Sequence, residues 1–254
     1  GAIAKIRRRL ASLRQVIGVD GLPGVSGALA WNDVLAEGSA EAFAVDTGDG
    51  DGYMIAYTSG TTGRPKGALT TVAARWASIG LTYANEMFVT PADTMLHVAS
   101  LAHGSGTKVL PVFAKGGKNV LAGRFSPCEF FRLVEAHKST MSWMVPTMVA
   151  MLADAPERAD FDLSSLHTVI YGGAPMPEPV RARALAAFGP IFVQIYGLTE
   201  APHRDLILTK LEHLPDPVTG KPVAAGATGR VAIGARVRLV GAEGREVGPG
   251  EVGE

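Results

Sequence analysis

From Tyr53 onward, short β-prone runs alternate with longer helix-like segments along the chain. The expected strands are Tyr53–Tyr57, Thr94–Ser100, Asn119–Leu121, Thr140–Val145, Leu166–Tyr171 and Ile191–Tyr196. The expected helices are Thr70–Phe88, Gly106–Ala114, Ser126–His137, Pro146–Ala153 and Glu178–Phe188. Strands separated by helices of this length imply right-handed crossovers. The pattern therefore predicts an α/β fold, with a mostly parallel sheet flanked by helices on both faces.

The pattern of residues along the sequence changes after about Pro215. Arg230–Val240 and Gly248–Glu254 are rich in Val and Gly and show no helical period, which is typical of β structure. We therefore expect residues 1–214 to form the α/β core portion and residues 215–254 to be a truncated β-rich segment. At the other end, Lys5 and Arg7 to Arg9 interleave with apolar residues at helical spacing, which favours an amphipathic surface helix over a membrane or nucleic-acid patch.

Composition and charge exclude several classes of protein. Apolar residues make up 47% of the chain, enough for a packed core, and 24 basic residues balance 24 acidic ones. That balance argues against a nucleic-acid binder that works by charge alone. The longest apolar stretch, Trp143–Ala153, is interrupted by Pro146 and is too short to span a bilayer. Cys128 is the only cysteine, and no secretory signal is evident, so we expect a cytoplasmic protein.

The clearest chemical signal is the stretch Thr58–Gly67, between an expected strand and an expected helix. Its glycines free backbone N–H groups to face one anion, its hydroxyls add donors, and Lys66 adds a positive charge. Composition alone leaves two interpretations open, a polyphosphate-binding loop and a polar surface loop. It is not a Walker loop, because Gly63 is followed by Arg64 and Pro65. The residues of this loop proposed to bind phosphate are Thr58, Ser59, Gly60, Thr61, Thr62, Gly63 and Lys66.

Two further segments follow in order, Tyr171–Pro177 (YGGAPMP) and Gln194–Glu200 (QIYGLTE). Together with Tyr57–Gly67 they resemble the signature motifs of the adenylate-forming superfamily, which comprises acyl-CoA synthetases, luciferases and the adenylation domains of peptide synthetases. Leu101–Gly104 and Gly250–Glu254 resemble two further family motifs less closely. The resemblance covers most of the chain, and it places the second and third motifs at strand ends, where an open α/β sheet binds ligands.

The resemblance implies an ATP-dependent acid–thiol ligase that uses Mg²⁺ and coenzyme A. Lys66 and its loop would handle the β- and γ-phosphates, Thr199 the α-phosphate, and Glu200 the metal, since a hard cation prefers carboxylate oxygen. Lys66, Thr199 and Glu200 would be the catalytic residues. The adenine would lie against Gly172, Gly173, Ala174, Pro175, Tyr196 and Gly197. The acyl pocket would lie near His103, Met144, Val145, Gly172 and Tyr196.

The expected function is activation of a small carboxylic acid, fatty or aryl, to an acyl-adenylate, followed by thioester formation with coenzyme A. Two alternatives stay open: an adenylation domain that loads a carrier protein, and a catalytically silent nucleotide- or acyl-binding module. The family's ribose-binding Asp and C-terminal domain are expected to lie beyond Glu254, so we expect this stretch alone to be inactive. A homo-oligomer is compatible with the sequence.

Overall fold

The computed structural model of the chain describes residues 2–19, 25–41, 43–58, 63–201, 205–220 and 226–254. The chain divides into two compact units, Gly1–Asp46 and Thr47–Glu254. The described residues of the first unit form α1 (Ala2–Ile6), a 3₁₀ turn (Arg7–Arg9), parallel strands β1 (Ile17–Gly18) and β2 (Leu29–Ala30), and α2 (Trp31–Glu37). The basic segment at the start is thus helical, although its α-helix ends at Ile6. The boundary expected at residues 214/215 stays a prediction.

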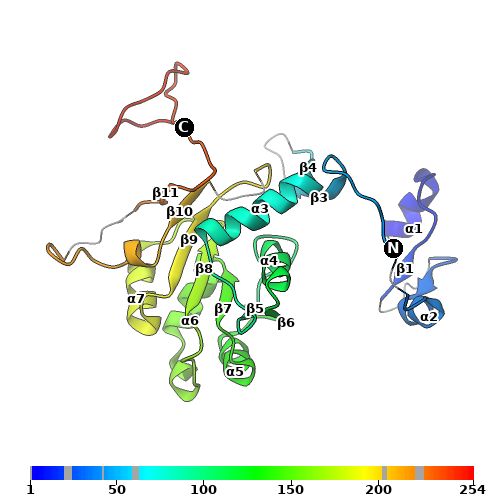
Figure 1. Ribbon diagram of the computed structural model, residues 1–254, viewed down its shortest axis with the longest axis horizontal. Coiled ribbons are helices and arrows are strands. Elements are labelled where there is room, and N and C mark those ends of the chain that lie inside the picture. The colour runs from blue at the N-terminus through cyan, green and yellow to red at the C-terminus, as the bar shows by residue number, and fades with distance from the viewer. Residues whose placement is uncertain (1, 20–24, 42, 59–62, 202–204, 221–225) are drawn as a thin grey trace. The chain divides into compact units, whose positions relative to one another are not determined.

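A seven-stranded sheet forms the centre of the second unit (Figure 1). Its strand order is β11-β10-β9-β8-β7-β5-β6. The strands are β5 (Thr94–His97), β6 (Lys118–Leu121), β7 (Met141–Met144), β8 (Thr168–Gly172), β9 (Phe192–Tyr196), β10 (Leu206–Leu208) and β11 (Arg230–Val231). Strands β5 to β9 are all parallel to one another. Strands β10 and β11 extend the sheet beyond β9, each antiparallel to its neighbour. The expected mostly parallel sheet is confirmed.

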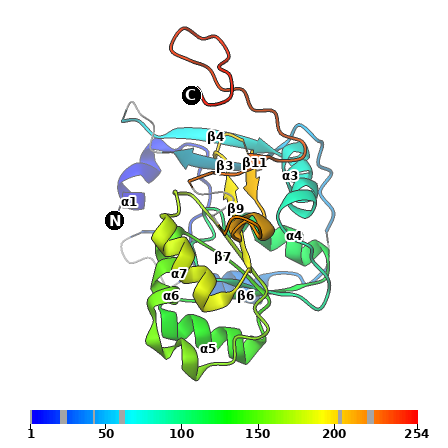
Figure 2. The same ribbon diagram turned by 90° about the vertical axis from the view of Figure 1, so that its left-hand side faces the viewer.

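Helices cover both faces of this sheet. They are α3 (Val72–Asn85), α4 (Val109–Ala114), α5 (Pro127–His137), α6 (Pro146–Asp154) and α7 (Glu178–Phe188). Alternate strand residues enter two separate cores: Val169 and Tyr171 pack with α5, α6 and α7, whereas Ile170 packs with residues of α3 and α4. Figures 1 and 2 show α3 and α4 on the side of the sheet away from α6 and α7. This alternation follows from the two-residue period of a strand.

Local sequence explains where the helices begin and end. Ser126 caps α5, because its Oγ accepts from the backbone N–H of Glu129 at 3.3 Å, and Pro127 takes the first helical position. Helix α7 ends at Phe188 because Gly189 adopts φ +73°, which suits a residue without Cβ. Among the described helices, none is long and apolar enough to cross a membrane.

Two segments differ from the expected pattern. The chain forms an antiparallel hairpin from β3 (Gly52–Thr58) and β4 (Lys66–Thr71), and α3 begins only after it. The second strand was missed because Gly67 and Ala68 are weak strand formers. Among the described residues after position 215, only Arg230–Val231 joins the sheet, and an isolated bridge pairs Val240 with Glu246. The β structure expected over Gly248–Glu254 is not a regular strand: these residues form turns and irregular backbone, although Glu254 and Val240 exchange two backbone hydrogen bonds of 2.8 Å.

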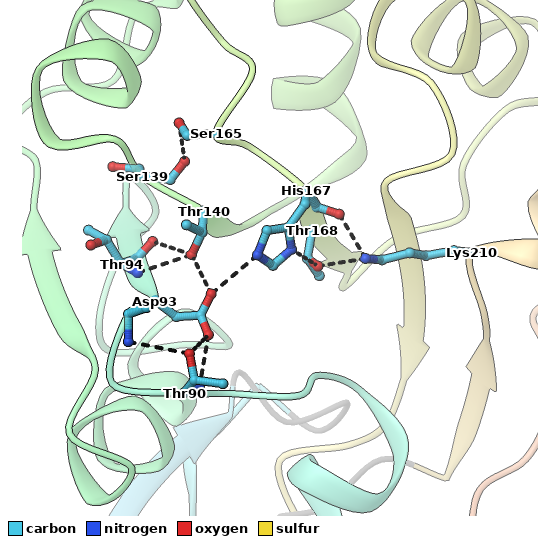
Figure 3. Close-up of polar contacts among 10 residues, drawn as sticks. Thr90, Asp93, Thr94, Ser139, Thr140, Ser165, His167, Thr168 and Lys210 are labelled. Carbon is cyan, nitrogen blue, oxygen red and sulfur yellow. Dashed lines mark hydrogen bonds and ion pairs between the residues drawn. The ribbon is translucent and has the colours of Figure 1, made fainter.

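A polar cluster joins the amino ends of the parallel strands, at the edge opposite the strand ends where ligands are expected (Figure 3). Asp93 lies at its centre and accepts from Thr90 Oγ1 at 2.8 Å, Thr140 Oγ1 at 2.9 Å and His167 Nε2 at 3.2 Å. Lys210 Nζ donates to the His167 carbonyl at 2.7 Å. Burial would raise the pKa of Asp93, but the hydrogen bonds from Thr90, Thr140 and His167 together lower it below its ordinary value.

Asp93→Asn should therefore make the unfolding free energy less dependent on pH in the acid range. Because the pKa of Asp93 is lower in the folded protein, its contribution is fully present above the ordinary value of 3.8 and disappears as the pH falls through the folded pKa. At neutral pH the substitution should cost about 1–3 kcal/mol, since it removes charge-assisted hydrogen bonds. Urea unfolding of both proteins from pH 7 to 2.5 measures this, and parallel curves would contradict it.

Candidate functional site

A cavity of about 390 Å³ lies at the carboxyl ends of β8 and β9. Its lining consists of the loops that follow these strands, one face of α7, and a segment from later in the chain. These residues are Gly173, Ala174, Pro175, Met176, Glu178, Arg181, Gln194, Ile195, Tyr196, Gly197, Leu198, Gly226, Ala227 and Thr228. The structure therefore brings together the predicted adenine-side residues Gly173–Pro175 with Tyr196 and Gly197.

The register of β8 against β9 places the two loops side by side. Gly172 pairs with Ile195, and a Cβ on Gly172 would lie 2.5 Å from the carbonyl O of Ile195. Only glycine fits this close approach. The next residue, Gly173, has φ +82°, which turns the chain away from the strand and over the cavity. Tyr196 ends β9 with 45% of its surface exposed, so its ring is accessible to a ligand.

Hydrogen bonds and an ion pair hold several of the polar residues that line the cavity. Gln194 lies two residues before Tyr196, and its side chain bonds to the Tyr171 hydroxyl and the Thr228 carbonyl. Arg181, which is buried, pairs with Glu178 at 2.7 Å. Burial raises the pKa of the Tyr171 hydroxyl, so this group keeps its proton and stays a hydrogen-bond donor.

Sequence reasoning missed much of this lining, although one signal was present. Gln194 precedes Tyr196 by one strand period, which predicts that both lie on the same face of β9. No comparable signal marks Gly226–Thr228, which reach the cavity only through the fold. His213, whose Nε2 lies 2.9 Å from the Tyr171 hydroxyl, is also buried, and burial lowers its pKa.

The predicted phosphate loop connects the two strands of the β3–β4 hairpin. Thr58 and Lys66 are directly paired across the hairpin, and Lys66 is exposed. Ser59, Gly60, Thr61 and Thr62 lie outside the described residues. Gly63 has φ +80°, a conformation that favours glycine. The hairpin thus places a hydroxyl residue and a cationic residue opposite each other at the two ends of the loop.

Thr199 and Glu200 follow β9 and are both exposed. In the part of the chain that the structure describes, no group of three or more His, Cys, Asp or Glu residues could hold a metal ion. A Mg²⁺ ion held by Glu200 together with phosphate and water oxygens would suit the ligand preference of this cation. The assignment of Thr199 and Glu200 stays a prediction.

Of the five residues expected for the acyl pocket, only Tyr196 lines the cavity. His103 is exposed in the turn after β5, next to Gly104, where a Cβ would lie 2.2 Å from the Trp143 ring. Met144 is fully buried in the core beneath α5 and α6. Val145 is half-buried and lies beside Gly173. Neither these three nor Gly172 lines the cavity, and their assignment to an acyl pocket remains a prediction.

Comparisons with known proteins agree with the motifs. The family model described as AMP-binding enzyme matches residues 2–254. A medium/long-chain-fatty-acid–CoA ligase of Mycobacterium tuberculosis is 37% identical over 202 residues, covering 79% of this chain and 34% of the relative. A feruloyl-CoA synthase of an Amycolatopsis species is 36% identical over 209 residues, covering 80% of this chain and 40% of the relative.

Solved structures give the same result for the fold. An anthranilate CoA ligase in complex with anthranoyl-AMP superposes with a TM-score of 0.80 at 22% identity, covering 99% of this chain and 46% of that one. The amide bond synthetase of Marinactinospora thermotolerans superposes with a TM-score of 0.70 at 30% identity, covering 78% and 38%. The chain thus spans less than half the length of each of these relatives.

Proposed function

This chain belongs to the AMP-binding enzyme family, and from that premise we propose that its cavity holds the adenylate of a carboxylic-acid–CoA ligase reaction. The observation that carries the proposal is the meeting of Gly173–Pro175 with Tyr196 and Gly197 in one cavity. A flat aromatic base fits between the Tyr196 ring and the glycine-rich loop. Gly172 supports this loop by its close approach to β9.

The proposed reaction has two steps. A carboxylate oxygen attacks the α-phosphorus of ATP, the bond to the bridging oxygen breaks, and pyrophosphate leaves with its electron pair. The thiol of coenzyme A then attacks the acyl carbon, loses its proton, and displaces AMP. Because the first step joins two anions, its barrier falls when fixed donors and cations absorb the charge. Lys66, Thr58 and the loop between them would contact the β- and γ-phosphates, and Thr199 the α-phosphate.

Mg²⁺ bound at Glu200 would neutralise phosphate charge. The acid is proposed to be fatty or aryl, because the two sequence relatives are named for fatty-acid and feruloyl substrates. It would approach from the side of His103 and Val145. Coenzyme A is the favoured acceptor, since these relatives are all CoA ligases. An amine is the second candidate, because a structural relative is named an amide bond synthetase. A carrier-protein thiol stays the alternative that the sequence left open.

The chemistry is tested by acid-dependent exchange of labelled pyrophosphate into ATP. A panel of fatty and aryl acids, each with and without coenzyme A, would identify the substrate. The assay uses a protein that extends beyond Glu254, because this stretch alone is expected to be inactive. In that protein, exchange that needs no acid, or no exchange with any acid despite ATP binding, would count against ligase chemistry and favour a silent nucleotide-binding module.

Lys66→Ala should weaken ATP binding about tenfold while leaving AMP binding nearly unchanged. Lys66 is assigned to the β- and γ-phosphates, which AMP lacks, and a tenfold loss is about 1.4 kcal/mol, typical of one charge-assisted hydrogen bond. Calorimetric titration of each nucleotide measures the two affinities. Lys118→Ala, which removes another exposed lysine at the start of β6, is the control and should change neither. Equal losses for ATP and AMP would refute the assignment of Lys66.

A further inference from the structure

A continuous path of polar side chains runs from Lys210 to Asp93 in the polar cluster at the amino ends of the strands (Figure 3). Lys210 Nζ donates to Thr168 Oγ1 at 2.7 Å, and this oxygen lies 2.9 Å from His167 Nδ1. The other nitrogen of the same ring, His167 Nε2, lies 3.2 Å from Asp93 Oδ1. The path therefore joins the loop after β10, the start of β8 and the residue before β5.

The position of each proton in this path follows from the charge of Asp93. Burial would raise the pKa of this carboxyl, but its hydrogen bonds hold the pKa below the ordinary value, so the group is ionised at neutral pH. A carboxylate can only accept, so the neutral His167 ring carries its proton on Nε2 and accepts at Nδ1. The Thr168 hydroxyl therefore donates to Nδ1 while its oxygen accepts from Lys210. Each group is thus set to pass a proton from Lys210 to His167.

The amino group of Lys210 is held by neutral acceptors. Its second hydrogen bond goes to the carbonyl O of His167 at 2.7 Å and lies at the protein surface. Among the described residues, no carboxylate pairs with Lys210, and Glu212, two positions further on, is engaged by Thr209 and Arg230. Burial lowers the pKa of Lys210, because its ammonium is partly removed from water. Once neutral, the amine keeps both hydrogen bonds through its two N–H groups, and its lone pair is available for attack.

We propose that Lys210 is a site of Nε-acylation by acyl thioesters, and that Thr168 and His167 form the path that removes its proton. A proton passes from Nζ to Thr168 Oγ1 while the hydroxyl proton of Thr168 passes to His167 Nδ1. The Asp93 carboxylate stabilises the imidazolium that results. The lone pair of Nζ then attacks the thioester carbonyl carbon, the C–S bond breaks, and the thiolate leaves with its electron pair. The nitrogen loses two protons in all, of which one ends on the thiol and the other in solvent.

Two features of the molecule favour this chemistry. The His167 side chain is 51% exposed, so the proton that it receives can pass on to water. The proposed ligase reaction produces an acyl thioester, so the co-reactant would be present wherever the enzyme is active. The path lies at the edge of the sheet opposite the cavity, and a supplied thioester replaces the product. The inference therefore goes beyond the proposed function and is tested without it.

The test is the acylation rate of each lysine when the protein is incubated with acetyl-CoA, measured by mass spectrometry of its peptides. Lys210 should react at least about tenfold faster than Lys118, an exposed lysine at the start of β6. Thr168→Val removes the hydroxyl at nearly constant size, and should slow Lys210 about tenfold while Lys118 is unchanged. Thr140→Val is the matched control, because it removes a hydroxyl from the same cluster but leaves the path intact. It should leave the Lys210 rate within about twofold.

Each outcome either supports the proposal or overturns it. Equal rates at Lys210 and Lys118 overturn it, as does an unchanged Lys210 rate in Thr168→Val. An equal slowing in Thr140→Val overturns it too, because the effect would then be a general loosening of the cluster. Should Thr168→Val not fold, His167→Ala replaces it, and an unchanged rate in that variant overturns the proposal. None of these results bears on the proposed function, which pyrophosphate exchange and nucleotide titration test separately.

Discussion

Replacing Lys108 with methionine should lower the free energy of unfolding of this chain by about 3–5 kcal/mol. Lys108 ends a 3₁₀ turn, Gly106–Lys108, and its side chain has no exposed surface. Its ammonium forms an ion pair with Glu86, whose side chain is only 3% exposed. Methionine preserves the apolar stem, so the main change is that the buried carboxylate of Glu86 loses this partner. A buried charge deprived of its partner is among the largest effects of a single substitution.

The matched control is Lys138→Met. Lys138 pairs with Asp162 at 2.8 Å, but these side chains are 62% and 49% exposed, so the loss of this pair should cost much less than the loss of the buried one. Urea unfolding followed by tryptophan fluorescence compares the two variants. Adding Glu86→Leu to Lys108→Met should recover part of the loss, because the buried carboxylate that has lost its cation is then removed as well. Equal costs for Lys108→Met and Lys138→Met would show that burial does not determine the strength of the Lys108–Glu86 pair.

The position of Lys108 could not be read from the sequence, whereas much of the sheet could. Strands such as Thr168–Gly172 were predictable because they are continuous apolar runs, as expected for strands covered on both faces. Helix α5 was predictable from its capping residues, which act locally. A lysine in a short helical segment reads as a surface residue, and only tertiary packing of α3 against the 3₁₀ turn buries it.

In the candidate site, too, some features could be predicted from the sequence and others depend on tertiary packing. Gly173–Pro175 and Tyr196 meet because β8 and β9 are parallel neighbours, and the carboxyl ends of such strands share one edge. Motifs and topology therefore suffice to place them together. The support behind them is non-local: His213 and Thr228 reach Tyr171 and Gln194 across 42 and 34 residues of sequence. Neither periodicity nor a short motif predicts contacts between residues so far apart in the sequence. These contacts could therefore be found only from the structure.

The junction between β8 and β9 carries the second large expected effect. Gly172→Ala should weaken AMP binding by about 10- to 100-fold, because overpacking at a rigid contact costs about 1–3 kcal/mol. The added Cβ would lie 2.5 Å from the carbonyl O of Ile195 and 2.9 Å from its Cγ1. A side chain can turn aside, but the carbonyl belongs to the backbone of β9. The strands must therefore separate at the end where their loops form the cavity, which moves Gly173 away from Tyr196.

Gly80→Ala separates this effect from a general response to added methyl groups. Gly80 lies within α3, and nothing would lie within 4 Å of its Cβ. This variant should gain about 0.5–1 kcal/mol of stability, since alanine favours the helix, and should bind AMP as the wild type does. Calorimetry at matched protein concentration measures both affinities. Wild-type AMP binding by a folded Gly172→Ala protein would mean that the spacing of β8 and β9 does not shape the nucleotide site, and the cavity would then lose its assignment as that site.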